Sequence, residues 1–202
     1  TGFLGIPLCA ALFGEEAIGH AVAYDVLVNS VLFLTAGFAI GAGMGTRGGA
    51  TPRERVKAFV LRNPPLAAVL AALVAPDALA PDALHDVAEV LALFLLPVGF
   101  FIVGVTLAAE AEEGQTAFPP PFTRPVGVAL ALRLAVAPAL MAGLSALTFD
   151  VPDAYYVEAA MPTGVNAIVV AHAYGLDLRL ASAAVAATTA VVAVAAIVAG
   201  FA

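Results

Sequence analysis

The chain has 202 residues, of which 62% are hydrophobic and only 11% are charged, and its mean hydropathy is +1.02. Soluble domains carry about a quarter charged residues, so this composition excludes an ordinary soluble domain. The net charge of -7 and the small basic set of one Lys and seven Arg exclude a nucleic-acid-binding surface. The single Cys9 excludes an internal disulfide, and without a CxxC pair or a Cys/His cluster no metal or cofactor is expected.

The apolar residues come in runs of about twenty, which is the length that crosses about 30 Å of hydrocarbon. Only helices and closed barrels satisfy the backbone in lipid, and these runs lack the alternation of barrel strands. The sequence therefore predicts an all-α polytopic membrane protein embedded in the lipid bilayer. The seven expected spans are residues 1–13, 21–43, 63–80, 86–108, 125–147, 154–174 and 178–201.

The first span, residues 1–13, is short and is interrupted by Gly2, Gly5 and Pro7. Proline removes a backbone N–H and its ring crowds the preceding turn, so we expect a broken helix here. The second span, 21–43, runs into a Gly-rich stretch.

The segment 45–62 is the strongest basic loop, with Arg53, Arg55, Lys57 and Arg62. Short loops rich in Lys and Arg remain in the cytoplasm, so we place this loop inside a cell membrane and expect 53–62 to form an interfacial helix. Alternation of the seven spans then puts the C-terminus outside.

The third span should begin at Asn63, with its side chain as the N-cap and Pro64 in the first turn. The later spans are separated by an acidic, proline-rich loop at 109–124, by FDVPD at 149–153 and by a very short loop at 175–179.

Two segments share a pattern: Thr1-Gly2 leads through Ile6 to a Phe-Gly pair, and Thr163-Gly164 leads through Ile168 to a Tyr-Gly pair. Five crossings separate them, and an odd number reverses the direction in the membrane. The pattern therefore predicts an inverted repeat. Backbone groups freed by a break at membrane depth are tolerated only beside a cavity or a partner, and such a place can bind a solute.

TGFLGIPL in the first span and MPTGVNAIVVAHAYG in the sixth resemble the crossover helices of the auxin efflux carrier family, also called PIN-like transporters. NPPLAAVLAALV after a basic loop is similar to the start of that family's second half. The resemblance extends over essentially the whole chain.

The resemblance implies ten helices arranged as two inverted five-helix repeats, with helices four and nine broken. The seven spans would be helices four to ten, so the chain is expected to lack about three N-terminal helices. The implied plan assigns 1–44 to the end of the first repeat, 45–62 to a cytoplasmic linker and 63–202 to the second repeat. It also implies a secondary transporter of small organic anions, such as auxin or dicarboxylates, and suggests a homodimer.

A carboxylate-bearing substrate is expected at the crossover of the two broken helices. Half-helix N-termini offer unpaired N–H groups there without a buried cation. Asn166 and Asn29 carry amides that either bind a carboxylate or make structural hydrogen bonds; the resemblance places Asn29 where plant members carry a substrate-contacting Gln. The expected substrate-binding residues are Gly5, Pro7, Asn29, Pro162, Thr163, Gly164 and Asn166.

Asp25, Arg133, Glu158 and His172 are ionisable residues that fall within the spans. Asp25 and Glu158 are candidates for ion coupling, because an intramembrane carboxylate is a functional candidate by default. For Glu158 we nevertheless favour a solvated position near the outer interface. Arg133 is expected to extend toward the cytoplasmic side, and His172 to be structural or interfacial.

A sodium or proton antiporter of similar architecture is the main alternative, with Asp25 or Glu158 binding the ion; the absence of paired intramembrane aspartates weakens it. A channel or a structural subunit also stays open. No GxSxG, HExxH or His/Asp cluster appears, so an enzyme is not expected.

Overall fold

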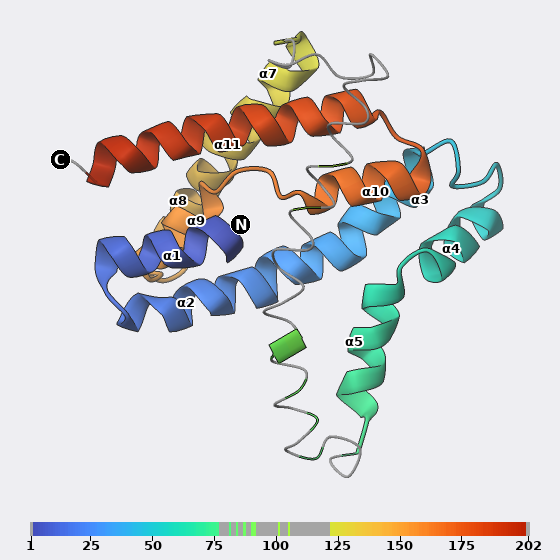
Figure 1. Ribbon diagram of the computed structural model, residues 1–202, viewed down its shortest axis with the longest axis horizontal. Coiled ribbons are helices and arrows are strands. Elements are labelled where there is room, and N and C mark those ends of the chain that lie inside the picture. The colour runs from blue at the N-terminus through green and yellow to red at the C-terminus, as the bar shows by residue number, and fades with distance from the viewer. Residues whose placement is uncertain are drawn as a thin grey trace.

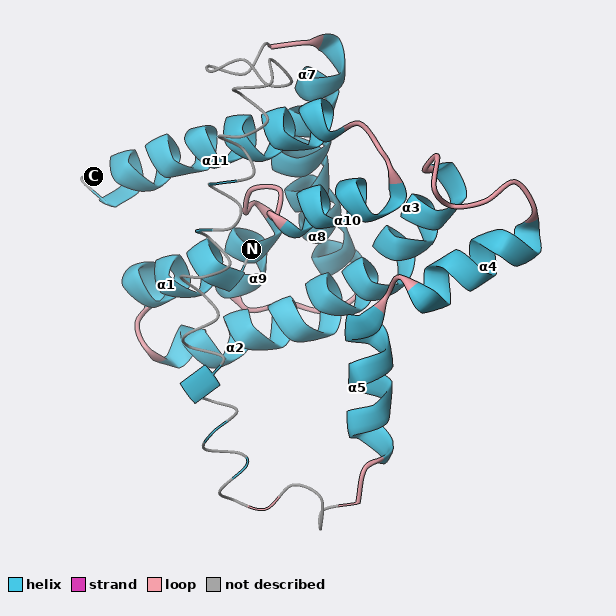
Figure 2. Ribbon diagram, turned by 45° about the vertical axis from the view of Figure 1, so that its right-hand side comes forward, coloured by secondary structure: helices cyan, strands magenta, loops and turns pink. Residues whose placement is uncertain are grey.

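The computed structural model describes residues 2–76 and 122–200, together with single positions between these two ranges. Every element in the described part of the chain is a helix (Figures 1 and 2), which confirms the all-α prediction. Most of the expected span 86–108 and most of the acidic loop lie outside the described residues.

The described chain begins with a helical hairpin. Helix α1 (Gly2–Phe13) ends at Gly14, whose φ of +88° is a left-handed conformation that suits glycine. Four segments then form one continuous apolar helix over Glu16–Met44, 29 residues long, which we call the long helix. Its segments are α2 (Glu16–Tyr24), η1 (Asp25–Ser30), η2 (Phe33–Gly37) and α3 (Phe38–Met44), of which η1 and η2 are π-helical.

The predicted break at Pro7 is wrong, because α1 continues through this residue and Pro7 is exposed. A proline removes the hydrogen bond to the carbonyl four residues earlier, and its ring crowds the turn that precedes it. Little more than one turn of α1 precedes Pro7, so few bonds lie upstream of it.

The basic segment contains a helix over the range predicted for it, and Asn63 caps the next helix as predicted. Helix α4 (Pro52–Leu61) starts with a capping box between Thr51 and Glu54, and α5 (Pro64–Val74) starts with the Asn63 side chain accepting the N–H of Leu66. The two helices are bent by 66° relative to each other. Helix α5 ends before the predicted residue 80, because Ala75 precedes a proline and adopts the extended backbone that this neighbour favours.

The C-terminal part contains two more apolar helices of spanning length. Residues Arg124–Leu147 combine α7 (Arg124–Ala131), π-helical η4 (Leu132–Val136) and α8 (Ala137–Leu147). Helix α11 covers Leu178–Gly200. Between them, the predicted broken span consists of α9 (Asp153–Ala159) and α10 (Asn166–Tyr174).

The order of directions supports the inverted repeat. In Figure 1, α1 runs toward the left and the long helix returns toward the right, whereas α10 runs toward the right and α11 returns toward the left. The two pairs therefore have the same connection with opposite sense. Two buried clusters join the first pair to the broken span: Cys9, Ala17, Ala21 and Ala154 form the cluster with α9, and Phe38, Ala42, Val170 and Tyr174 form the cluster with α10.

Most large apolar side chains outside these clusters are exposed. Such a surface would be an aggregation hazard in water, but it matches a lipid environment. By length and composition, three described helices are able to cross a membrane, and the bent pair α4–α5 is a fourth candidate.

Candidate functional site

The break between α9 and α10 lies at the centre of the described fold. Helix α9 ends at Ala159, with Ala160 as its C-cap, α10 begins at Asn166, and the backbone between them is not helical. The break is anchored to α11, because the N–H of Thr163 donates to Oγ1 of Thr188 at 3.0 Å. Thr188 is fully buried and donates in turn to the carbonyl of Ala184 at 2.7 Å. A freed N–H of the break therefore finds a partner inside the protein.

Glu158 lies just before this break and faces α1. Its side chain is fully buried, and neither carboxyl oxygen has a hydrogen-bond partner among the described residues. A Cβ added to Gly5 would come 2.6 Å from Oε2 of Glu158. The missing side chain of Gly5 thus leaves the space that the carboxyl group fills.

Asp25 lies on the adjacent long helix and has partners. Its Oδ1 accepts the N–H of Gly2 at 3.1 Å and Nδ2 of Asn29 at 3.1 Å. One amide hydrogen of Asn29 is therefore bonded to Asp25, which agrees with the structural hydrogen bond that is one of the two roles expected for Asn29. Asp25 is also close enough to Glu158 to interact with it electrostatically.

Arg133 brings the opposite charge to the same region. It is partly buried in η4 and interacts electrostatically with Glu158 and with the Tyr24 hydroxyl group. The ring of Tyr24 packs edge-on against Tyr155 of α9, with 5.3 Å between ring centroids. We call Gly5, Asp25, Asn29, Arg133 and Glu158 the crossover cluster.

One sequence expectation needs correction here. Glu158 is not solvated, because α9 packs against α1 and α2 and turns this side chain inward. The extension of Arg133 toward the cytoplasmic side stays a prediction. Thr188 is not among the site residues predicted from the sequence. The only feature of the sequence that marks it is its position beside Thr189 in an apolar run.

The other expected binding residues lie along the break and on α1. Pro162 is buried, Thr163 and Gly164 are partly exposed, and Asn166 is exposed as the first residue of α10. Pro7 points away from the buried part of α1, so it is not brought together with the cluster. Of the expected residues, Gly5 and Asn29 are the ones that join it.

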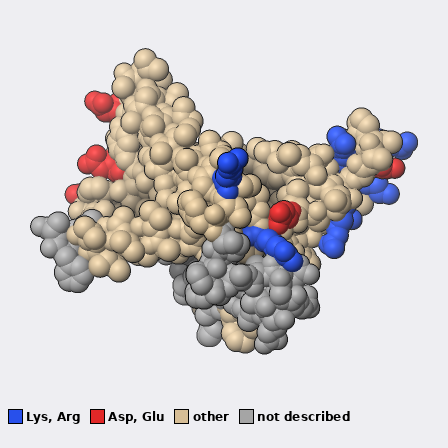
Figure 3. Space-filling view, turned by 90° about the horizontal axis from the view of Figure 1, so that it is seen from above, with Lys and Arg blue, Asp and Glu red and all other residues tan. Residues whose placement is uncertain are grey.

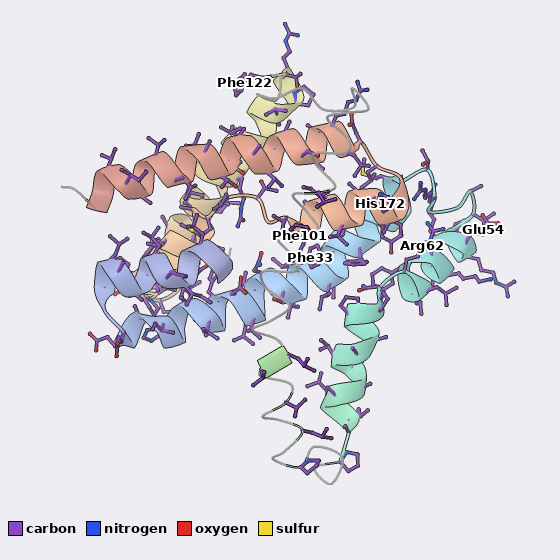
Figure 4. The ribbon with its side chains drawn as sticks, viewed as in Figure 1. Phe33, Glu54, Arg62, Phe101, Phe122 and His172 are labelled. Carbon is purple, nitrogen blue, oxygen red and sulfur yellow. The ribbon has the colours of Figure 1, made fainter. Side chains whose placement is uncertain are left out.

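A second polar region caps the other end of α10. Arg47 donates from its side chain to the carbonyl of His172 at 2.9 Å and from its backbone to that of Tyr174 at 2.9 Å. Arg62 donates to the carbonyl of Ala173 at 3.1 Å and to that of Arg47 at 2.8 Å. We call Arg47, Arg62 and these carbonyls the basic clasp; Figure 4 labels Arg62 and His172 there.

The clasp also involves close backbone packing. Gly45 lies against Tyr174, and the Tyr174 hydroxyl group donates to the carbonyl of Ala58 at 3.3 Å. Gly175 follows with φ of +69°, the left-handed conformation typical of a helix C-terminus. His172 contributes its carbonyl oxygen, which agrees with the structural role expected for this residue.

Charges are unevenly distributed along the molecule. Figure 3 shows a group of Lys and Arg side chains at the end where α4 lies and acidic side chains at the opposite end, with charges of both signs near the middle. At the start of α4, the backbone N–H groups of Thr51 and Ala50 donate to Glu54 and hold the pKa of its carboxyl group below the ordinary value.

Apolar spanning helices, a broken helix and buried charges at the break together define a polytopic membrane transport protein. A family model described as "Membrane transport protein" matches residues 53–199, which is more than half of the chain. The chain therefore belongs to this family of membrane transporters, and the resemblance to auxin efflux carriers is confirmed. No curated protein and no solved structure matches it.

Proposed function

We propose that this protein is a secondary transporter that carries small organic anions, such as auxin-like acids or dicarboxylates, across the cell membrane. The observation that carries the proposal is the break at 160–165, from which α10 starts beside α11. The N–H groups of Ala167 and Ile168 already donate to the carbonyls of Gly164 and Val165 at 3.0 Å, but the start of the helix still carries partial positive charge, which suits a carboxylate. Asn166 is exposed at this start and offers an amide donor.

The charge distribution supports an orientation with the segment 45–62 in the cytoplasm and the C-terminus outside. Basic residues concentrate at the α4 end of the molecule, and positive charge is retained on the cytoplasmic side. Substrate would then reach the crossover from either side in turn, as alternating access requires.

Uptake of radiolabelled small carboxylates into proteoliposomes tests this function. We expect saturable uptake that unlabelled carboxylates inhibit, because a carrier has a binding site and a pore does not. Asn166→Ala should weaken substrate binding and leave membrane insertion intact, and Asn29→Ala should do the same. Thr189→Ala, at an exposed position of α11, is the matched control and should leave affinity unchanged. Unchanged affinity in both asparagine variants would remove them from the site.

A cation antiporter is the second candidate, because the crossover cluster holds two acidic side chains close to each other, one of them fully buried. Vesicles loaded with a pH-sensitive dye separate the two functions. An antiporter would move protons when sodium is added without any carboxylate, whereas the proposed anion carrier would not.

A further inference from the structure

The two carboxyl groups of the crossover cluster, those of Asp25 and Glu158, differ in their hydrogen bonding. Asp25 accepts two hydrogen bonds from N–H donors. Glu158 is fully buried and accepts none from the described residues. An ionised carboxylate in the position of Glu158 would lose its hydration and gain no donor in return, which is unfavourable.

Groups on three neighbouring elements bear on the charge of Glu158. Helix α1 brings the Cys9 thiol, the long helix brings Tyr24 and Asp25, and η4 brings Arg133. A negative charge on Asp25 opposes a second one nearby, whereas Arg133 favours it. None of these groups donates a hydrogen bond to the Glu158 carboxyl oxygens, so the charge is not neutralised by direct contact.

The geometry favours a proton over a metal cation as the occupant. Metal cations that prefer oxygen ligands take about six or more at about 2–2.6 Å. The Glu158 carboxyl group instead lies against the backbone of α1 at Gly5, where even a methyl group would not fit. Within the described residues, no group of three His, Cys, Asp or Glu side chains comes together to hold a metal.

We propose that Glu158 is a proton-binding residue that couples transport to the proton gradient, which rests on the proposed carrier function. In the described conformation Glu158 is the neutral acid. When α1 and α9 separate and water enters, the O–H bond breaks heterolytically: the proton passes to water and the electron pair stays on the carboxylate. Return of the side chain to its buried position requires that a proton be bound again.

The protonation itself is testable without transport. Infrared spectra of the purified protein in lipid near neutral pH should show the C=O band of a buried carboxylic acid, since exposed acids are ionised there. The band should be lost in Glu158→Gln, whose amide has the shape of the neutral acid. It should remain in Asp153→Asn, which changes an exposed acid on the same helix, and in Asp25→Asn. Persistence of the band in Glu158→Gln, or its absence from the unmodified protein, would overturn the proposal.

The coupling is tested in proteoliposomes that take up a radiolabelled carboxylate. An inward proton gradient should drive accumulation in the unmodified protein and in Asp153→Asn, and this accumulation should be lost in Glu158→Gln. Gradient-driven accumulation that survives in Glu158→Gln, or uptake that responds to sodium and not to pH, would refute coupling at this residue. A protein with the infrared band but without any carboxylate uptake would refute the proposed carrier function and leave the proton site standing.

Discussion

The crossover cluster and the basic clasp lie at opposite ends of the same short region, one before α10 and one after it. They differ in whether their polar groups have hydrogen-bond partners. At the clasp, Arg47 and Arg62 donate to the last carbonyls of α10, so the free end of the helix is satisfied. At the crossover, the carboxyl group of Glu158 is buried without a hydrogen bond from the described residues. The hydrogen bonds of the clasp stabilise the end of α10, whereas the crossover retains a buried group without such stabilisation, which the proposed proton site would account for.

The largest expected effect is at the clasp. In Gly45→Ala the new Cβ would overlap the carbonyl oxygen of Tyr174 and lie 2.7 Å from that of Gly41, and backbone atoms cannot turn aside. We expect a loss of about 2–3 kcal/mol in the free energy of unfolding, measured by chemical denaturation in mixed micelles. Gly43→Ala is the control, since nothing lies within 4 Å of its Cβ position, and it should be neutral or slightly stabilising. Equal effects of the two changes would contradict the close packing of α3 on α10.

An intermediate effect is expected at the crossover. Gly5→Ala should cost about 1–2 kcal/mol, because its methyl group meets the carboxyl group of Glu158, which is the flexible end of a side chain. The cost should largely vanish in the Glu158→Ala background, and a double-mutant cycle measures this coupling. Gly19→Ala, which has open space around it, should be independent of Glu158. Additive effects of Gly5→Ala and Glu158→Ala would show that the two residues do not share this space.

The smallest effect is expected for one arginine of the clasp. Arg62→Ala removes hydrogen bonds to the carbonyls of Ala173 and Arg47, but the side chain is exposed and solvent replaces part of the loss. We expect about 1 kcal/mol of destabilisation, with faster amide exchange near the end of α10. Arg53→Ala, an exposed change on the same helix, should leave that exchange unaltered. If both variants speed amide exchange equally, then the net charge, and not the hydrogen bonds of the clasp, controls amide exchange at the end of α10.

Local chemistry made some of these features predictable. The start of α5 followed from Asn63 and the prolines after it, and the break before α10 followed from Pro162 and Gly164. The burial of Glu158 did not follow, because it depends on Gly5, 153 positions earlier in the chain (158 − 5 = 153). The clasp was equally hidden, since Arg47 and His172 are 125 positions apart. Contacts between distant helices decide such features, and hydropathy carries no information about them.

The π-helical segments of the long helix have a consequence for its phase. Ala21 packs in the cluster with Ala154 of α9, and Phe38 packs in the cluster with Val170 of α10. They are 17 positions apart (38 − 21 = 17), which in a regular α-helix is about 4.7 turns, so the two side chains would point to different sides. The wider turns of η1 and η2 hold more residues each and bring the separation closer to a whole number of turns. The long helix therefore packs against both α9 and α10. If either π-helical segment became a regular α-helix, the long helix would lose its contact with one of these two helices.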